Sequence, residues 1–373
     1  MDLKTADATE ISARLDAGEL SCVELMQATL DRIAAVNGTV NAIVSLRDPE
    51  RLLAEAAEAD RGPRAGWLHG IPIAIKDLAN AEGLPTSRGS PLFARLPAGT
   101  DDVMVARLRA AGAIVIGKTN TPEFGLGSHT FNPVHGATLN PYDTTRSCGG
   151  SSGGAAVALA TGMLCVADGS DMMGSLRNPA GWNNVYGMRP TWGTVPSEPE
   201  GDMYLHQLST NGPMARSPAD LAALLDTMTG ADPRQPLTTS PRATAGGLAR
   251  APKRKRIGWL GDWDGALPLE AGIAEISAQA MNTLADLGHR VEPLAAPFDA
   301  DAMWHSWTDL RSFAVAGGWA TFTAILSWRA ISNPPPSGRS SADWRCRRRR
   351  CSAPAKSGRT GFAAPRACSR PMT

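Results

Sequence analysis

The chain has 373 residues, of which 43% are hydrophobic and 20% charged, and its formal net charge is +1. This composition is that of a globular protein with a substantial core, and it excludes a collagen, a coiled coil and a wholly disordered chain. No run of 18 apolar residues occurs, and the first twenty residues contain no apolar segment of the secretory type. We therefore expect a cytoplasmic protein without a membrane span or a membrane partner.

The small net charge conceals an uneven distribution of charged residues. Residues 331–373 carry nine Arg and one Lys against a single Asp, whereas residues 1–330 carry 27 basic and 35 acidic residues. An acidic body without a basic stripe is poorly suited to bind nucleic acid. We expect no nucleic-acid partner.

Apolar periodicity predicts helices that alternate with short strands over the first 330 residues, which is typical of an α/β protein with a mostly parallel sheet between helices. The first clear helix begins with a capping box at 21–24 and is expected to end near Val36. The other expected helices are 49–60, 101–111 and 270–287. The expected strands are 71–76, 113–116, 163–167, 256–260 and 290–294.

The end of the chain has a different composition. From about Ala324 the helical pattern decays into a segment rich in Pro, Arg and Cys without apolar periodicity. A shifted reading frame of a GC-rich gene, native disorder and a basic arm would each produce such a segment. We therefore expect a domain over 1–325 and an irregular, disordered tail over 326–373.

The densest local motif is the run GGSSGG at 149–154, which is followed directly by AAVALA. Such a run alone could be a flexible linker. The apolar residues after it instead predict a tight loop that opens a buried helix, whose first N–H groups point at whatever the loop holds. The run is not a phosphate-binding P-loop, because no Lys-Ser or Lys-Thr pair follows the glycines.

The same run contains the pattern G-x-S-x-G twice, centred on Ser151 and on Ser152. This pattern marks the nucleophile of an α/β-hydrolase only between a strand and a helix, and residues 140–148 are turn-forming residues. The histidines that could act as its base are His206, His289 and His305. An α/β-hydrolase with Ser151 as nucleophile is a competing hypothesis.

A second motif, DGSDMMGSLRNPA, covers residues 168–180. The strand-like run 163–167 enters a polar turn just before Ser175. Such a turn exposes consecutive backbone N–H groups, which an oxyanion hole requires. A plain connection between a strand and a loop would give the same pattern.

Lys76 ends the apolar run 71–76. A lysine at the end of a strand is ordinarily solvated, but neighbours this apolar predict burial. A buried ammonium group loses its proton more readily, and a neutral lysine can act as the base for a serine nucleophile.

Together these motifs resemble those of the amidase signature family of serine hydrolases. The glycine and serine run resembles the family's GGSSGG, residues 169–180 resemble G-[ST]-D-x-G-G-S-[IL]-R-x-P-A, and 71–77 resemble its apolar stretch ending in K-D. The flanking segments 117–120 (GKTN), 187–191 (GMRPT) and 212–216 (GPMAR) agree with it. The resemblance covers about residues 5–320 and implies a single α/β/α sandwich with a large mixed sheet, incomplete at its C-terminal end.

The resemblance also implies a site. Ser175 would be the nucleophile, Ser151 the bridging serine after a cis peptide bond, and Lys76 the base. Backbone N–H groups would form the oxyanion hole, namely those of Met172, Met173, Gly174 and Ser175. The supporting loop residues would be Gly149, Gly150, Ser152 and Gly153. The implied reaction is hydrolysis of a small or medium carboxamide through an acyl-enzyme, with no metal and no organic cofactor.

Two departures from the family pattern bear on function. Met173 stands where the pattern has its first glycine, so we expect a narrower substrate pocket and a changed acyl preference. The C-terminal part that completes the sheet in the family is replaced by the basic tail, so a truncated, catalytically impaired product is an alternative. The amidase subunit of a tRNA-dependent amidotransferase is another alternative, and the sequence leaves a homodimer open.

Overall fold

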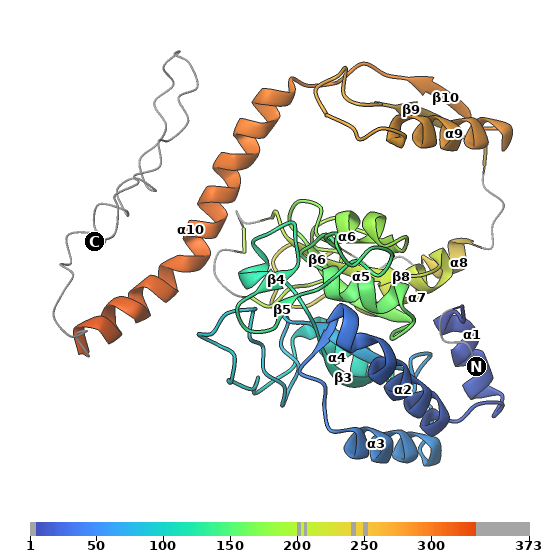
Figure 1. The fold of residues 1–373 in the computed structure, drawn as a ribbon, viewed down its shortest axis with the longest axis vertical. Helices are drawn as coiled ribbons and strands as arrows, with labels where there is room; N and C mark the ends of the chain where they lie inside the picture. Colours follow the sequence, from blue (N-terminus) through green and yellow to red (C-terminus); the bar gives the residue numbers. More distant parts are fainter. Residues whose placement is uncertain (1–4, 200–202, 205–206, 240–243, 249–252, 333–373) are drawn as a thin grey trace. The chain divides into compact units, whose positions relative to one another are not determined.

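The structure, a computed structural model, describes residues 5–199, 203–204, 207–239, 244–248 and 253–332, with side-chain surroundings as far as residue 317. The chain divides into two units, Met1–Pro297 and Phe298–Thr373, each of which is described by itself. Figure 1 shows the course of the chain. Among the described helices, none combines the length and the apolar character needed to cross a membrane.

Two three-stranded sheets form the centre of the first unit. The first has the order β1-β3-β2, in which β2 pairs parallel and β1 antiparallel with β3. The second has the order β6-β8-β7 and is antiparallel throughout. Strands β2 and β6 lie side by side, and the backbone N–H of Lys76 on β2 donates to the Asp168 carboxylate on β6 at 2.9 Å. The bounds are β1 (Ile43–Val44), β2 (Pro72–Lys76), β3 (Ile114–Thr119), β6 (Val166–Asp171), β7 (Tyr186–Gly187) and β8 (Thr210–Ala215).

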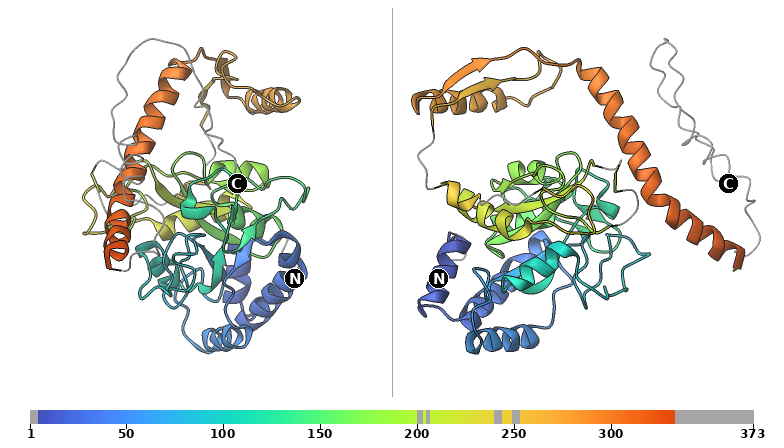
Figure 2. Two further views of the ribbon diagram at one scale, coloured as in Figure 1. Left: turned by 60° about the vertical axis from the view of Figure 1, so that its left-hand side comes forward. Right: turned by 180° about the vertical axis from the view of Figure 1, so that it is seen from behind.

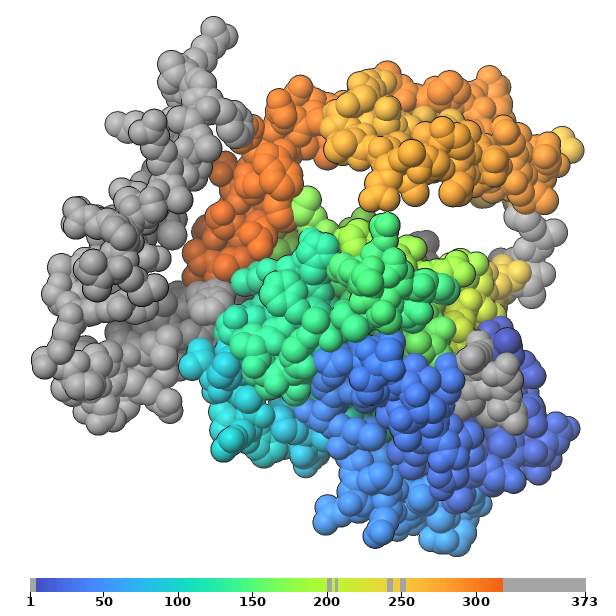
Figure 3. Space-filling model, in the orientation of Figure 1, coloured from blue at the N-terminus to red at the C-terminus, as the bar shows by residue number. Residues whose placement is uncertain are grey.

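Helices cover both faces of this centre, as Figure 1 and Figure 2 show. Alternate residues of one strand point to opposite faces: Ala74 packs in the core cluster of α2, α3 and α5, whereas Ile73 and Ile75 pack in the cluster of α1, α4 and α7. The N-terminal helices, blue in Figure 3, pack directly against the green middle part of the chain. The bounds are α1 (Ala8–Asp16), α2 (Cys22–Val40), α3 (Pro49–Arg61), α4 (Val103–Ala110), α5 (Gly153–Ala160) and α7 (Pro218–Met228).

The remaining elements are shorter or stand apart. Strands β9 (Arg256–Trp259) and β10 (Arg290–Pro293) pair parallel around α9 (Ile273–Asp286), which makes a βαβ unit. Phe131–Asn132 (β4) and Gly136–Ala137 (β5) form a short hairpin. The others are η1 (Glu123–Gly125), α6 (Arg177–Trp182), α8 (Ala245–Leu248) and α10 (Ala300–Ser332).

This architecture confirms the predicted α/β/α class and the mixed sheet, with one correction. Only the pairs β2–β3 and β9–β10 are parallel among the described strands, and the other four pairs are antiparallel. The described sheets are therefore not mostly parallel. The helix-strand alternation that suggests parallel pairing does not reveal that β8 returns antiparallel to β6.

Element boundaries also differ in informative ways. The capping box at Ser21 and Glu24 is present, but α2 continues to Val40 and ends where Asn41 takes a left-handed conformation with φ 53°. Strand β6 begins at Val166 rather than 163 and extends through polar residues to Asp171. Its polar half is held by pairing with β8, which apolar periodicity cannot detect.

The predicted boundary of the C-terminal tail needs correction as well. Residues 326–332, expected to be irregular, belong to helix α10. The rest of the predicted tail, 333–373, lies outside the described residues.

Candidate active site

The glycine and serine loop is a buried turn that leads directly into α5, as expected. The Gly150–Ser151 peptide bond is cis, and Gly149 has φ +75°. Thr130 holds the loop from the side: its hydroxyl donates to the Gly149 carbonyl at 2.8 Å and accepts the Gly153 N–H at 3.2 Å. These contacts present the Ser151 hydroxyl at one defined position.

Lys76, at the end of β2, reaches this loop with its side chain, which is almost completely buried, with 1% exposed. The ammonium nitrogen Nζ lies 2.8 Å from Ser151 Oγ and 2.8 Å from Ser152 Oγ. It also donates to the Ser170 hydroxyl at 3.0 Å and to the Ser170 carbonyl at 3.3 Å. The structure therefore brings Lys76 and Ser151 together, although they lie 75 positions apart in the chain.

Burial changes the acid-base behaviour of this lysine. Desolvation lowers the pKa of Lys76 to about 7, although the negative charges of Asp168 and Asp171 oppose the shift. At neutral pH a large fraction of Lys76 is therefore the free amine, which can accept a proton. This is the property that general-base catalysis requires.

Ser175 lies in the turn between β6 and α6, next to the loop. The Ser152 N–H donates to the Ser175 carbonyl at 3.1 Å, which joins the two segments. Gly174, just before Ser175, has φ +107°, a conformation that favours glycine. The hydrogen bond between the two segments is thus made by their backbones, one residue along the loop from Ser151.

Asp171 holds the turn in shape. Its carboxylate is fully buried and accepts the N–H groups of Gly174 at 2.6 Å and of Leu176 at 3.1 Å. Arg177 adds two hydrogen bonds, at 3.0 and 3.1 Å. Burial by itself would raise the pKa of Asp171, but the hydrogen bonds from Arg177 and from the backbone outweigh it and keep the pKa below its usual value.

This arrangement changes the expected oxyanion hole. The Gly174 N–H already donates to Asp171, so in this conformation it is not free to receive an oxyanion. Met172, Met173 and Ser175 stay as candidate donors. Sequence reasoning could not detect this, because it treats every N–H of a turn as available.

Of the three histidines of the competing hypothesis, only His289 is both described and part of the same unit as the loop. His206 lies outside the described residues, and His289 accepts the backbone N–H of Lys255 at 3.1 Å. His305 belongs to α10, in the second unit. No strand is present over 140–148 either, so the strand-to-helix geometry of an α/β-hydrolase nucleophile is absent there.

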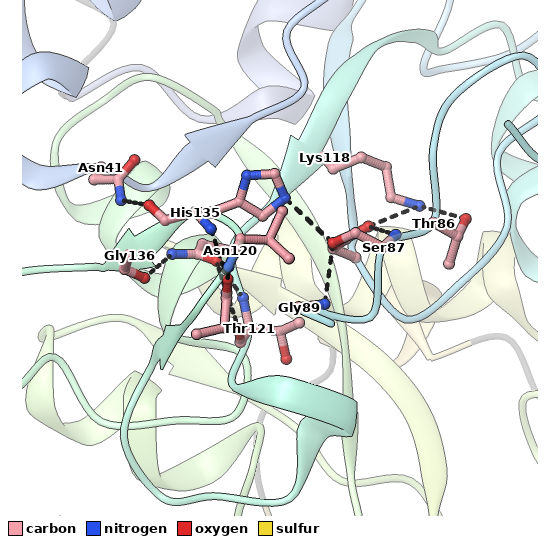
Figure 4. A network of polar contacts seen from close by, with 12 residues as sticks. Asn41, Thr86, Ser87, Gly89, Lys118, Asn120, Thr121, His135 and Gly136 are labelled. Carbon is pink, nitrogen blue, oxygen red and sulfur yellow. Dashed lines mark hydrogen bonds and ion pairs between the residues drawn. The ribbon is translucent and has the colours of Figure 1, made fainter. Parts of the chain in front are cut away.

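A second buried polar network, which the sequence analysis missed, lies at the ends of β2 and β3 (Figure 4). Lys118 is fully buried and donates to a backbone carbonyl and to the Thr86 hydroxyl. Its Nζ lies 4.0 Å from the Asp77 carboxylate. The Ser87 hydroxyl donates to Asp77 and lies 3.2 Å from His135 Nε2. The sequence did contain a sign of this network, since Lys118 belongs to the flanking motif GKTN.

Comparisons with known proteins agree with this geometry. The chain is 39% identical over 311 residues to an indoleacetamide hydrolase of Bradyrhizobium diazoefficiens, an alignment that covers 81% of this chain and 58% of that protein. It is 38% identical over 306 residues to one of the subunits of the glutamyl-tRNA(Gln) amidotransferase of Chloroflexus aurantiacus, with 79% and 61% covered. The chain thus spans about three fifths of the length of these relatives.

A solved structure and a family model give the same assignment. The crystal structure of a bacterial aryl acylamidase of the amidase signature family matches with a TM-score of 0.78 and 28% identity, over 86% of this chain and 67% of that one. The family model described as Amidase matches residues 24–320, which is most of the chain. The chain belongs to the amidase signature family.

Proposed function

We propose that this chain carries a Ser–cis-Ser–Lys relay and hydrolyses a small or medium carboxamide to a carboxylate and ammonia or an amine. One observation carries the proposal above all others: the buried Lys76 Nζ lies 2.8 Å from Ser151 Oγ. The next residue of the loop, Ser152, donates its backbone N–H to the carbonyl of Ser175. A lysine pKa near neutrality supports the role of base.

The mechanism follows from the chemistry of these groups. The neutral amine of Lys76 takes the proton of Ser151 Oγ, which takes the proton of Ser175 Oγ as that oxygen attacks the amide carbon. Backbone N–H groups of the turn, with Met172, Met173 and Ser175 as candidates, stabilise the negative oxygen. The relay then reverses and protonates the leaving nitrogen. Water attacks the acyl-enzyme with the same relay, releases the carboxylate and restores Ser175.

The substrate is proposed as a class only. One relative above is named for the hydrolysis of indoleacetamide, an amide with an aromatic acyl group. The other is named as a subunit of an amidotransferase, which is an amidase that works with partners. We favour an independent amidase, because the relay needs no group from a partner. The cytoplasmic location stays a prediction, and a homodimer is one arrangement that the sequence leaves open.

Covalent labelling of Ser175 tests this proposal. The purified full chain is incubated with a fluorophosphonate probe beside Ser175→Ala, Ser151→Ala and Lys76→Ala. We expect no labelling of Ser175→Ala and at least about 100-fold slower labelling of the other two variants, the lower end of typical losses of acid-base catalysis. Ser277→Ala, which removes a hydroxyl that only bonds its own helix α9, is the matched control and should be labelled like the wild type.

The outcomes separate the alternatives. A folded wild type that the probe does not label would refute the working relay and favour the impaired product. Labelling that survives in Lys76→Ala would refute the lysine base. Labelling of the predicted kind without release of product from any amide would point to the amidase component of an amidotransferase.

A further inference from the structure

Asp168, a buried carboxylate that the relay does not use, is acted on by the charges of both buried lysines of the sheet centre. It belongs to β6 and is 1% exposed. Lys76 on β2 is 1% exposed and Lys118 on β3 is 0% exposed. Buried charges of this kind are costly unless opposite charges compensate one another. The three groups therefore form one electrostatic unit.

The geometry ties Asp168 to the relay directly. Its Oδ1 accepts the backbone N–H of Lys76 at 2.9 Å, at the edge of β2 that faces β6. The Asp168 side chain thus accepts the hydrogen bond that a backbone carbonyl of a neighbouring strand would accept within a sheet. Because the same residue Lys76 also holds Ser151 through Nζ, the position of the base depends on the Asp168 carboxylate.

Few other charged groups face Asp168, Lys76 and Lys118 from the elements packed against them. Besides Asp168, Lys76 faces Asp171. Strand β8 places Pro213 opposite Asp168, and α5 contains no ionisable side chain. The charged groups that act on Lys118 are Asp77, Asp168, Asp102 and Arg88.

The protonation equilibria are accordingly linked. Burial raises the pKa of Asp168 to about 6, while the Lys76 N–H and the charges of Lys118 and Lys76 hold it down. Burial lowers the pKa of Lys118 as well, and Asp77 and Asp168 oppose this. The two lysines therefore both favour the ionised form of Asp168.

We propose that Asp168 is a positioning residue of the relay, whose carboxylate fixes the backbone of Lys76 and whose charge, shared with Lys118, sets the pH at which Lys76 becomes a base. The inference rests on the proposed function, since it gives Lys76 the part of the base. It extends the site to a group that touches neither the nucleophile nor the bridging serine.

The proposal makes two predictions of the same sign. Removal of the negative charge in Asp168→Asn destabilises the ammonium form of Lys76, so that the amine forms at lower pH. The asparagine oxygen can still accept the Lys76 N–H, which preserves the backbone contact. Lys118→Met removes a positive charge that favours the ionised form of Asp168, so that Asp168 takes up a proton more readily and the Lys76 amine again forms at lower pH, by a smaller shift. A purely structural role of Asp168 would produce neither shift.

The test uses ¹⁵N NMR of the full chain with ¹⁵Nζ-labelled lysine. The sequence contains six lysines, and Lys76→Met identifies the signal of interest by its disappearance. We expect the Lys76 titration midpoint to fall by about one pH unit or more in Asp168→Asn and by a smaller amount in Lys118→Met. Asp220→Asn is the matched control: Asp220 is a buried carboxylate that likewise accepts backbone N–H groups, at Ala8 and Thr9. It should leave the midpoint unchanged.

An unshifted midpoint in Asp168→Asn, or a rise of the midpoint in Lys118→Met, would overturn the inference. If Asp168→Asn fails to fold, the direction of the shift in Lys118→Met decides. The titration is read without turnover, so it is separate from the labelling test. Shifts of the expected signs in a chain that the probe does not label would support the charge coupling and refute the proposed hydrolysis.

Discussion

Asp171 Oδ1 accepts the backbone N–H of Gly174 at 2.6 Å, one residue before the proposed nucleophile Ser175. A second N–H, that of Leu176, reaches the other carboxylate oxygen at 3.1 Å. The turn is thus bound on both sides of the nucleophile by one buried side chain. This relationship explains how a short, irregular connection between β6 and α6 can keep a reactive hydroxyl in place.

Asp171→Ala should therefore lower both stability and labelling. It leaves two N–H groups without their acceptor, at a cost of about 1–3 kcal/mol each where they are buried. We expect a corresponding loss in the free energy of unfolding, measured by urea denaturation, and a loss of labelling beyond the unfolded fraction. Asp143→Ala is the control, because Asp143 is exposed and bonds only its own turn. Equal effects of the two variants would contradict a special role of Asp171.

The activity should depend on pH through Lys76. Its pKa is lowered to about 7, and the active form is the unprotonated amine. Activity therefore rises as pH increases through about 7 and falls on acidification below it. The rate of probe labelling, followed from mildly acidic to mildly alkaline pH, measures this. A rate that stays constant across the neutral range would show that Lys76 is not the base.

Gly154 should tolerate no side chain. A Cβ there would lie 2.3 Å from the Asn120 nitrogen and 2.6 Å from the Ala42 carbonyl oxygen, both backbone atoms that cannot move aside cheaply. We expect Gly154→Ala to lower the melting temperature strongly and to abolish labelling. In Gly181→Ala, on α6, the new methyl group meets nothing within 4 Å, so this variant should be neutral or gain up to about 1 kcal/mol from helix propensity. Similar melting temperatures for the two variants would contradict the close approach of α5 to β3.

Met173 should influence the choice of acyl group. Its side chain is 49% exposed in the turn, where the family pattern has glycine. Met173→Gly removes this bulk, and we expect the ratio of kcat/KM for branched over linear acyl amides to rise about tenfold, the scale of discrimination by a few methylene groups. Met173→Leu keeps the bulk and should keep the ratio. The same ratio in all three proteins would contradict a role of Met173 in specificity.

Local sequence predicted most of the elements around the site. The capping box at Ser21, the helix after GGSSGG and the short strand ending at Lys76 follow from the chemistry of neighbouring residues, and each is present. Local patterns failed where distant segments decide. The polar half of β6 is a strand because β8 pairs with it, and the Gly174 N–H is occupied because Asp171 folds back onto it.

The sequence by itself determined the alternation of helices and strands and the three motifs that carry Lys76, Ser151 and Ser175, because periodicity and turn chemistry act over a few residues. The tertiary structure alone decided that the buried Asp168 carboxylate binds the backbone of Lys76 and is acted on by the charge of Lys118, and that Lys76 has a pKa near neutrality. Burial and charge depend on what packs across the sheet. Residues that lie tens of positions apart in the chain set them, and no local pattern records which of these residues will meet.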